Sequence, residues 1–461
     1  MRLVVDNMLR LSLNEDEADF GDKIRKDLRL TNPGYLLARR LGKDTRRMPR
    51  FFELAKGKEN EIEVPRGYRR RLWQQIRSDG IELESVEDLR SEGEAYEFNF
   101  NGELRSYQQD AVDRAISARD GVLCAPTGSG KTIIAMGIIA QLARKALVLV
   151  HTTALLQQTA ERIRKFLEVE PGLVGGGHES LGPVTVATIQ TLMRRPEDFL
   201  TESVGVVILD EAHHCPANTF RKVLQRFPAG HRIGLTATPE RKDQLHPILY
   251  ATAGPIFHRV DPEILRDRGA ILRLDLEEIL SHFSFDYEGN HTELLEAMIN
   301  DADRNTLIID SVLKIHRRQS LVLTDRVAHA FHLAEELGSV LGNRVGVVVG
   351  ETPPNLREEI FSDLENGRLD ILIATATLVG EGFDCPGLDA LFLCTPTGNE
   401  SRLTQLIGRI LRPHPDKPRP LVVDFVDPNI PVLARQSERR RQVYAEHRWR
   451  PEHDERSGVL L

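Results

Sequence analysis

The sequence predicts an α/β protein with two tandem domains, each a parallel sheet covered by helices, preceded by a smaller unit. From residue 102 onward, short apolar runs bounded by Gly, Pro or Thr alternate with segments of helical periodicity. This alternation is typical of parallel strands connected by helices. It occurs twice, which predicts two α/β domains, whereas the first hundred residues lack it. A length of 461 residues is compatible with about three domains.

The domain boundaries are predicted from these changes in pattern. The expected parts are an N-terminal accessory domain at 1–101, a first α/β domain at 102–260, a linker or domain edge at 261–300, a second α/β domain at 301–432, and a basic C-terminal helix and tail at 433–461. The first α/β domain has expected strands at 122–124, 146–150, 184–187, 204–209 and 232–235, and helices at 133–143 and 154–167. The second has expected strands at 320–323, 344–349, 370–374, 390–394 and 421–423, and helices at 327–341, 355–365 and 401–411. Three consecutive glycines at 175–177 predict a turn.

The composition excludes several classes of protein. Hydrophobic residues make up 41% and charged residues 28%, which excludes a collagen, a disordered chain and a small disulfide scaffold. Since no run of 18 apolar residues occurs, we expect no membrane span, and the early charges argue against a signal peptide. The four cysteines are scattered without a Cys-x-x-Cys pair, which argues against a zinc ribbon and predicts a reducing, cytoplasmic setting.

Positive charge is concentrated near the N-terminus of a chain whose net charge is −8. Residues 23–50 contain ten Lys and Arg against two acids, and residues 66–77 contain five Arg and no acid. Basic segments in an acidic chain indicate a local surface for nucleic acid, although solvated helix faces explain such runs equally well. Trp73 lies among these arginines, where it could stack on bases or, more commonly, anchor a small core.

The segment Ala125-Pro-Thr-Gly-Ser-Gly-Lys-Thr132 follows a predicted strand and begins a predicted helix. Glycines in this position let backbone N–H groups surround phosphate oxygens at the positive end of the helix. Lys131 is expected to reach the β- and γ-phosphates and Thr132 to ligate Mg²⁺. We therefore predict a site for ATP with Mg²⁺, with nucleotide contacts from Thr127, Gly128, Ser129, Gly130, Lys131 and Thr132.

A pair of carboxylates, Asp210 and Glu211, follows the apolar run 204–209. Because this run is an expected strand, the pair lies at the carboxyl edge of a sheet that also carries the phosphate loop. An Asp in this place is suited to hold the metal together with Thr132, and a Glu to activate the attacking water. The catalytic residues predicted here are therefore Lys131, Asp210 and Glu211.

The Asp-Glu-Ala-His sequence at 210–213, beside this phosphate loop, resembles the superfamily two helicases and translocases of the DEAD/DEAH type. Further segments match the motifs of that family in order, and they are Leu104–Gln108, His151–Leu155, Thr188–Thr191, Thr236–Pro239, Leu323–Arg326, Ala374–Thr377, Gly380–Pro386 and Gln405–Arg412. The resemblance covers about 104–445. It implies two RecA-like P-loop domains that hydrolyse ATP in the cleft between them.

The resemblance also implies a role for each matching residue. Gln108 would read the adenine, Gly382 and Asp384 would face the nucleotide, and Arg409 and Arg412 would reach the γ-phosphate as catalytic arginine fingers. The residues expected to contact the nucleic-acid backbone are Thr152, Thr188, Thr324, Thr375 and Thr377. The residues expected to couple hydrolysis to movement are Thr236, Thr238 and Gln405.

Within this family, Tyr107-Gln108 and Thr-Ala-Thr-Pro at 236–239 are similar to the XPB/UvsW and restriction-motor branch, the ResIII-type bacterial helicases. That branch mostly acts on DNA, which implies an ATP-dependent DNA helicase or translocase in repair, recombination or defence. Its N-terminal accessory domain would engage duplex or branched DNA. Two alternatives stay open, an ATP-dependent clamp or translocase subunit that does not separate strands, and an RNA helicase. Expected partners are DNA, or else RNA, and proteins of a repair or defence system, but no membrane.

Overall fold

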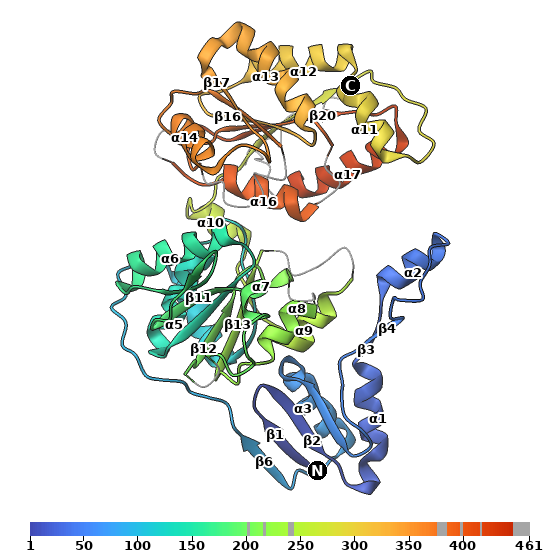
Figure 1. Cartoon of the computed structure of the whole chain (residues 1–461), viewed down its shortest axis with the longest axis vertical. Helices are drawn as coiled ribbons and strands as arrows, with labels where there is room; N and C mark the ends of the chain where they lie inside the picture. Colours follow the sequence, from blue (N-terminus) through green and yellow to red (C-terminus); the bar gives the residue numbers. More distant parts are fainter. Residues whose placement is uncertain are drawn as a thin grey trace, which may run out of the picture. The chain divides into compact units, whose positions relative to one another are not determined.

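The computed structural model describes residues 1–200, 203–214, 218–237, 244–375, 385–396, 400–414 and 417–445. The chain divides into two compact units, Met1–Asp261 and Pro262–Leu461. Within each unit, mostly parallel strands alternate with helices (Figure 1). In the described part of the chain, no helix combines the length and apolarity needed to cross a bilayer.

The first unit contains an eight-stranded sheet in the order β10-β9-β11-β8-β12-β13-β7-β14. Its strands are β7 (Asp120–Cys124), β8 (Ala146–Val150), β9 (Gly172–Gly175), β10 (His178–Glu179), β11 (Val184–Thr188), β12 (Val206–Leu209), β13 (His231–Thr236) and β14 (Ile256–Arg259). Its helices are α4 (Ser106–Ala118), α5 (Lys131–Leu142), α6 (Thr153–Leu167), α7 (Ile189–Leu192), α8 (Asn218–Leu224) and α9 (His246–Ala253), with a 3₁₀ turn at Ala212–His214. All pairings are parallel except β9 with β10. The central strands are apolar and buried because helices cover both faces of the sheet (Figure 1).

The glycine run at 175–177 makes a turn, as predicted. Gly176 and Gly177 connect β9 to the antiparallel β10, with φ angles of 61° and 87°. Two consecutive positive φ values suit a two-residue hairpin, and glycine adopts them without strain. The strands β9, β10 and β14 themselves were not predicted, since they lie toward the two edges of the sheet, where the apolar pattern is short.

The N-terminal residues form a four-stranded sheet in the order β5-β2-β1-β6. Its strands are β1 (Arg2–Val5), β2 (Met8–Ser12), β5 (Glu61–Pro65) and β6 (Ser85–Asp88), and it is accompanied by α1 (Ala18–Asp27), α3 (Arg69–Asp79) and 3₁₀ turns at Glu15–Glu17 and Arg66–Tyr68. Between α1 and β5 the chain leaves this sheet as an arm, residues 29–53, made of β3 (Arg29–Thr31), α2 (Pro33–Arg40) and β4 (Phe51–Glu53). Figure 1 shows the arm projecting from the N-terminal sheet.

The N-terminal sheet is joined to the larger sheet by a buried ion pair. Arg66 has no exposed surface, and its Nε donates to Oδ1 of Asp120, the first residue of β7, over 3.0 Å. Its Nη1 donates to the carbonyl of Ala229 over 2.7 Å. A Cβ on the neighbouring Gly67 would lie 2.3 Å from the nitrogen of Gly254. Because the contact is this close and this buried, residues 1–101 belong to the same compact unit as the α/β segment that follows.

The second unit contains a six-stranded parallel sheet in the order β15-β20-β19-β16-β18-β17. Its strands are β15 (Asp275–Leu280), β16 (Ser320–Thr324), β17 (Val345–Val348), β18 (Ile371–Thr375), β19 (Ala390–Leu393) and β20 (Leu421–Val426). Its helices are α10 (Pro262–Asp267), α11 (His291–Ile299), α12 (Ala302–Ile315), α13 (Val327–Leu341), α14 (Pro354–Glu365), α16 (Glu400–Ile410) and α17 (Pro431–Ala445), with a 3₁₀ turn at Gly342–Arg344. The segment 261–300, predicted as a linker or domain edge, thus supplies an edge strand, β15, and the residues of its sequence Asp-Leu-Glu-Glu-Ile-Leu are partly or fully exposed.

The basic helix predicted near the C-terminus is α17, and part of its charge is used inside the protein. Arg440 is 2% exposed, and its Nε donates to Oδ2 of Asp424 over 2.8 Å. The hydroxyl of Tyr444 donates to the same oxygen over 3.0 Å. These contacts attach α17 to β20, so Arg440 stabilises the unit and is not available to an external partner.

Candidate functional site

The phosphate loop connects the carboxyl end of β7 to the first turn of α5. Gly128 and Gly130 have φ angles of 86° and 81°, in the left-handed region that side chains disfavour. A Cβ on Gly130 would also lie 2.6 Å from Nε2 of Gln108. Both glycines are therefore required by the backbone, and the loop brings main-chain amides to the positive end of α5, an arrangement that binds phosphate.

The side chains of this loop are positioned for a phosphate ligand. Nζ of Lys131 donates to the carbonyl of Ala125 over 3.3 Å, and the side chain is partly exposed. Thr127 and Thr132 are also partly exposed. Ser129 is fully buried, and its Oγ has no hydrogen-bond partner among the described residues. A buried hydroxyl without a partner is uncommon and fits a loop that is completed by a ligand.

Gln108 supports the loop from beneath. Its Nε2 donates to the carbonyl of Ser129 over 3.0 Å, and its Oε1 accepts from the backbone N–H of Arg105 over 2.9 Å. The hydroxyl of Tyr107 donates to the same Ser129 carbonyl over 3.0 Å. The Gln108 carboxamide is thus engaged with the protein, and its contact with an adenine stays a prediction. The bracing role of Tyr107 had not been predicted.

Asp210 and Glu211 follow β12 at the carboxyl edge of the sheet. The backbone N–H of Glu211 donates to Oδ1 of Asp210 over 3.0 Å, and that of Asp210 to the carbonyl of Leu149 over 3.0 Å. Glu211 has a φ angle of 48°, a left-handed conformation that costs a non-glycine residue roughly 1–2 kcal/mol. Such strain is typical of functional positions.

The two carboxyl groups have different electrostatic surroundings. Burial, and then the charge of Glu211, raises the pKa of Asp210 to about 6. Burial also acts to raise the pKa of Glu211, but Lys131 and His213 outweigh it and lower that pKa to about 2. Glu211 is therefore the more firmly ionised of the two carboxyl groups.

The residues present fit a magnesium ion bound together with a nucleotide. Thr132 and Asp210 offer a hydroxyl and a carboxylate, the hard oxygen ligands that Mg²⁺ prefers. The raised pKa of Asp210 indicates buried negative charge that a cation would stabilise. The described residues contain no group of three or more His, Cys, Asp or Glu able to hold a metal. Mg²⁺ in nucleotide sites needs only one or two protein carboxylates, with phosphate and water as its other ligands.

A histidine connects the acidic pair to the neighbouring strand. Nδ1 of His213 lies 3.2 Å from Oε2 of Glu211 and 3.1 Å from Oγ1 of Thr236. Thr236 ends β13 and is completely buried. The His213 imidazole thus connects Glu211, the residue predicted to activate the attacking water, to Thr236, a predicted coupling residue. The other predicted coupling residue of this segment, Thr238, lies outside the described residues.

Two predicted strand contacts lie at the same edge of the first sheet. Thr152 follows β8 and caps α6, its Oγ1 accepting from the N–H of Leu155 over 3.3 Å. Thr188 ends β11 in register with Val150 of β8. These positions are neighbours at the carboxyl edge, but Thr188 is only 5% exposed and its Oγ1 donates to Oγ1 of Thr191 over 2.8 Å. Their contact with a nucleic-acid backbone stays a prediction.

The second unit places Thr324 and Thr375 in register at the ends of β16 and β18. Thr324, however, is completely buried, and its Oγ1 lies 2.8 Å from Nδ1 of His329, whose Nε2 contacts Asn305 over 3.0 Å. Burial lowers the pKa of His329 to about 3, so its ring is neutral at pH 7. The hydroxyl of Thr324 is therefore an internal anchor, and the sequence did not indicate this polar chain. Thr377, Gly382 and Asp384 lie outside the described residues.

The predicted arginine fingers lie at the end of α16. Gln405 and Arg409 are on the helix, and Arg412 follows its last residue, with its N–H donating to the carbonyl of Arg409 over 3.3 Å. All three side chains are partly exposed. Their action on a nucleotide bound to the first unit stays a prediction.

Comparison with known proteins identifies the family. Residues 101–241 match the domain described as "Type III restriction enzyme, res subunit", and residues 303–414 match the helicase conserved C-terminal domain. "Probable helicase D10" of Escherichia phage T5 is 30% identical over 339 residues, which are 70% of this chain and 71% of that protein. The chain belongs to the superfamily two helicases of the ResIII branch. This helicase is thus an ATP-hydrolysing enzyme, which confirms the predicted family and enzyme class.

Further comparisons show which proteins and solved structures the helicase is similar to. It is 28% identical over 348 residues to "DNA 3'-5' translocase XPB2" of Sulfurisphaera tokodaii, covering 67% of this chain and 79% of that one. The matched part of the chain covers 51% and 56% of the lengths of two other, longer relatives. The solved helicase domain of Pyrococcus furiosus Hef superposes with a TM-score of 0.51 at 17% identity, covering 73% of this chain and 98% of that domain. The last comparison confirms the predicted fold of two RecA-like domains.

Proposed function

We propose that this helicase is an ATP-dependent DNA helicase or translocase that acts in repair, recombination or defence. The observation that carries the proposal is the chain of contacts from Glu211 through His213 to Thr236, beside an intact phosphate loop. Such a chain is expected of an enzyme that turns over ATP and transmits the event. The relative described as a DNA 3'-5' translocase supports DNA as the substrate.

The geometry indicates how hydrolysis would proceed. The loop amides and Lys131 hold the phosphates, and Glu211, kept ionised by Lys131 and His213, accepts a proton from the attacking water. Thr132 and Asp210 would hold Mg²⁺, which neutralises phosphate charge when it is bound. Arg409 and Arg412 would add positive charge at the transition state, an effect of roughly 10³–10⁵ in rate for arginine fingers.

Some of the basic side chains in residues 23–50 and 66–77 form ion pairs within the protein, which leaves fewer positive charges available to bind DNA. The pairs formed within the protein are Lys23 with Asp79, Arg25 with Asp22, Arg29 with Glu53, Arg66 with Asp120 and Arg71 with Asp27. The cations of the arm that form no ion pair with any described residue are Arg39, Arg40, Lys43, Arg46, Arg47 and Arg50. Six unpaired cations within twelve residues make the arm the strongest candidate for contact with DNA phosphates.

The arm is ordered enough to act as a binding element. The backbone N–H of Asn32 donates to the carbonyl of Arg50 over 2.9 Å, and the side-chain Nδ2 of Asn32 donates to the carbonyl of Pro49 over 2.8 Å. The guanidinium of Arg50 lies 5.0 Å from the ring centre of Phe51. Leu37 and Leu41 nevertheless stay 56% and 59% exposed. Apolar side chains among cations are used by other proteins to enter a DNA groove or separate stacked bases.

The proposal is tested by the rate of ATP hydrolysis with single-stranded, duplex and forked DNA and with RNA, together with strand displacement on forked duplexes. Stimulation by DNA with displacement supports a DNA helicase. Stimulation by DNA without displacement on any duplex indicates a translocase or clamp. Stimulation by RNA alone contradicts the assignment of DNA.

A further inference from the structure

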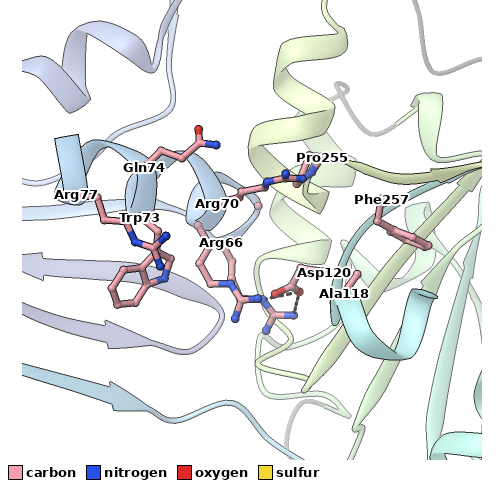
Figure 2. Close-up of a pocket in the computed structure, with 11 residues that line it drawn as sticks. Arg66, Arg70, Trp73, Gln74, Arg77, Ala118, Asp120, Pro255 and Phe257 are labelled. Carbon is pink, nitrogen blue, oxygen red and sulfur yellow. Dashed lines mark hydrogen bonds and ion pairs between the residues drawn. The ribbon is translucent and has the colours of Figure 1, made fainter. Parts of the chain in front are cut away.

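A pocket of about 600 Å³ lies where the N-terminal sheet meets the first α/β sheet. It is lined by Arg69, Arg70, Trp73 and Arg77 of α3 and by Phe257 of β14, among others (Figure 2). It adjoins Asp120, the first residue of β7, whereas the phosphate loop follows the other end of that strand. The pocket is therefore separate from the ATP site and lies at the opposite edge of the sheet.

The pocket is positively charged. Arg66, which also lines it, is neutralised by Asp120 at 3.0 Å. Arg69, Arg70 and Arg77 form no ion pair or hydrogen bond with any side chain that the structure describes. Three guanidinium groups without a hydrogen-bonded carboxylate around one cavity favour an anion, although Asp120 and Asp88 offset part of the charge of Arg69. Planar guanidinium groups are well suited to phosphate.

Aromatic rings give the pocket a second chemical character. Trp73 packs against the hydrophobic core of the N-terminal sheet but stays partly exposed, as does Phe257. Figure 2 shows the two rings on opposite sides of the pocket, with Arg70 between them. Aromatic faces beside arginines are the means by which proteins hold single nucleotides, through stacking on the base and charge on the phosphate. A volume of about 600 Å³ lies within the roughly 300–1,000 Å³ range of small-ligand sites.

We propose that this pocket binds one nucleotide unit, with its base against Trp73 or Phe257 and its phosphate on Arg70 or on Arg77, which Figure 2 shows in different parts of the pocket. The nucleotide comes either from an unpaired position of a DNA strand, in which case the inference rests on the proposed function, or from a free mononucleotide. Because Arg66 attaches α3 to the first sheet, a strand held here is fixed to that unit. The pocket would then be an anchor that does not move relative to the first α/β sheet.

Tryptophan fluorescence of the full-length protein tests the site directly. The chain has two tryptophans, so Trp449→Phe leaves Trp73 as the only one. The probes are a single-stranded oligothymidylate and thymidine 5′-monophosphate, which lacks the triphosphate that the phosphate loop recognises. We expect saturable quenching of Trp73 and at least tenfold weaker binding after Arg70→Ala or Arg77→Ala. Arg71→Ala is the matched control, since Arg71 lies on the same helix but pairs with Asp27, and it should leave the affinity unchanged.

Each result decides the proposal. Quenching by the oligonucleotide alone assigns the site to a strand, and quenching by both probes assigns it to a mononucleotide. No quenching by either probe, or quenching that persists in an Arg70→Ala/Arg77→Ala double variant, overturns the site. ATP hydrolysis measured in the same samples separates the two proposals. DNA-stimulated hydrolysis without quenching rejects the pocket alone, whereas quenching without DNA-stimulated hydrolysis rejects the proposed function alone.

Discussion

Nδ1 of His213 lies 3.1 Å from Oγ1 of Thr236, so the acidic motif at the end of β12 contacts the end of β13 directly. Both side chains are buried, at 9% and 0% exposure. The same Nδ1 also lies 3.2 Å from Oε2 of Glu211, and a buried polar group deprived of its hydrogen bond costs about 1–3 kcal/mol. Because one imidazole contacts both residues, a change at Glu211 has a direct path to Thr236.

Replacing Thr236 with Val should uncouple hydrolysis from movement. Thr236→Val keeps the volume but removes the oxygen, so we expect ATP hydrolysis to fall only a few-fold while base pairs opened per ATP fall about tenfold. The measurement is the ratio of displacement rate to ATPase rate on forked DNA. Thr252→Val is the control, since it removes another buried hydroxyl, which donates to Ile248 within α9. An unchanged ratio in Thr236→Val would contradict the coupling role.

Lys131 and Glu211 should differ in the step that each supports. Lys131→Ala should abolish ATP binding, because the ammonium contacts phosphate in the ground state. Glu211→Gln should bind ATP but hydrolyse it roughly 10²–10⁴-fold more slowly, because the amide cannot accept the proton of water. Equilibrium binding and single-turnover hydrolysis measure the two effects. The control is Lys145→Ala, which removes a surface lysine paired with Glu94 and should change neither ATP binding nor hydrolysis. Hydrolysis at the wild-type rate in Glu211→Gln would exclude Glu211 as the general base.

The sequence predicted the central strands closely because those strands are buried on both faces and therefore continuously apolar. The expected strand at 146–150 is β8, and the expected helix at 327–341 is α13. β15 was missed because it lies at a sheet edge, where charged residues are tolerated and the apolar run disappears. Local periodicity reports burial, so it identifies the centre of a sheet better than its edges.

The sequence predicted the identity of the site residues better than their contacts. Gln108 and Lys131 were recognised from motifs, but the hydrogen bond of Gln108 to the Ser129 carbonyl depends on how α4 packs beneath the loop. Thr324 was expected to contact the nucleic-acid backbone, whereas in the structure its hydroxyl is buried against His329, which is on the next helix. Spacing along the chain specifies neither packing nor burial, and these contacts became visible only in three dimensions.

The buried pair of Arg66 and Asp120 should be the main attachment of the N-terminal sheet. Arg66→Ala removes the hydrogen-bonded partner of Asp120, a carboxylate at 6% side-chain exposure, and leaves it only Arg90 at 3.7 Å, so the expected cost is at most about 3–5 kcal/mol. Denaturant unfolding of the full chain measures the loss. Arg71→Ala removes an exposed pair with Asp27 and should cost at most about 1 kcal/mol. Equal losses in the two variants would show that the buried pair has no special role.

Two adjacent cations of the arm should each contribute one phosphate contact. In Arg46→Gln/Arg47→Gln, we expect weaker binding of forked DNA and a slope of log affinity against log salt that is shallower by about 2, because each phosphate contact contributes roughly 0.9 on duplex DNA. Fluorescence anisotropy at several salt concentrations gives the slope. The control is Arg114→Gln/Arg164→Gln, which removes the same charge from exposed pairs with Asp110 and Glu170. If both double variants changed the slope equally, net charge rather than the arm would govern binding. If neither changed it, the arm would not contact DNA, and its exposed Leu37 and Leu41 would instead indicate a protein partner.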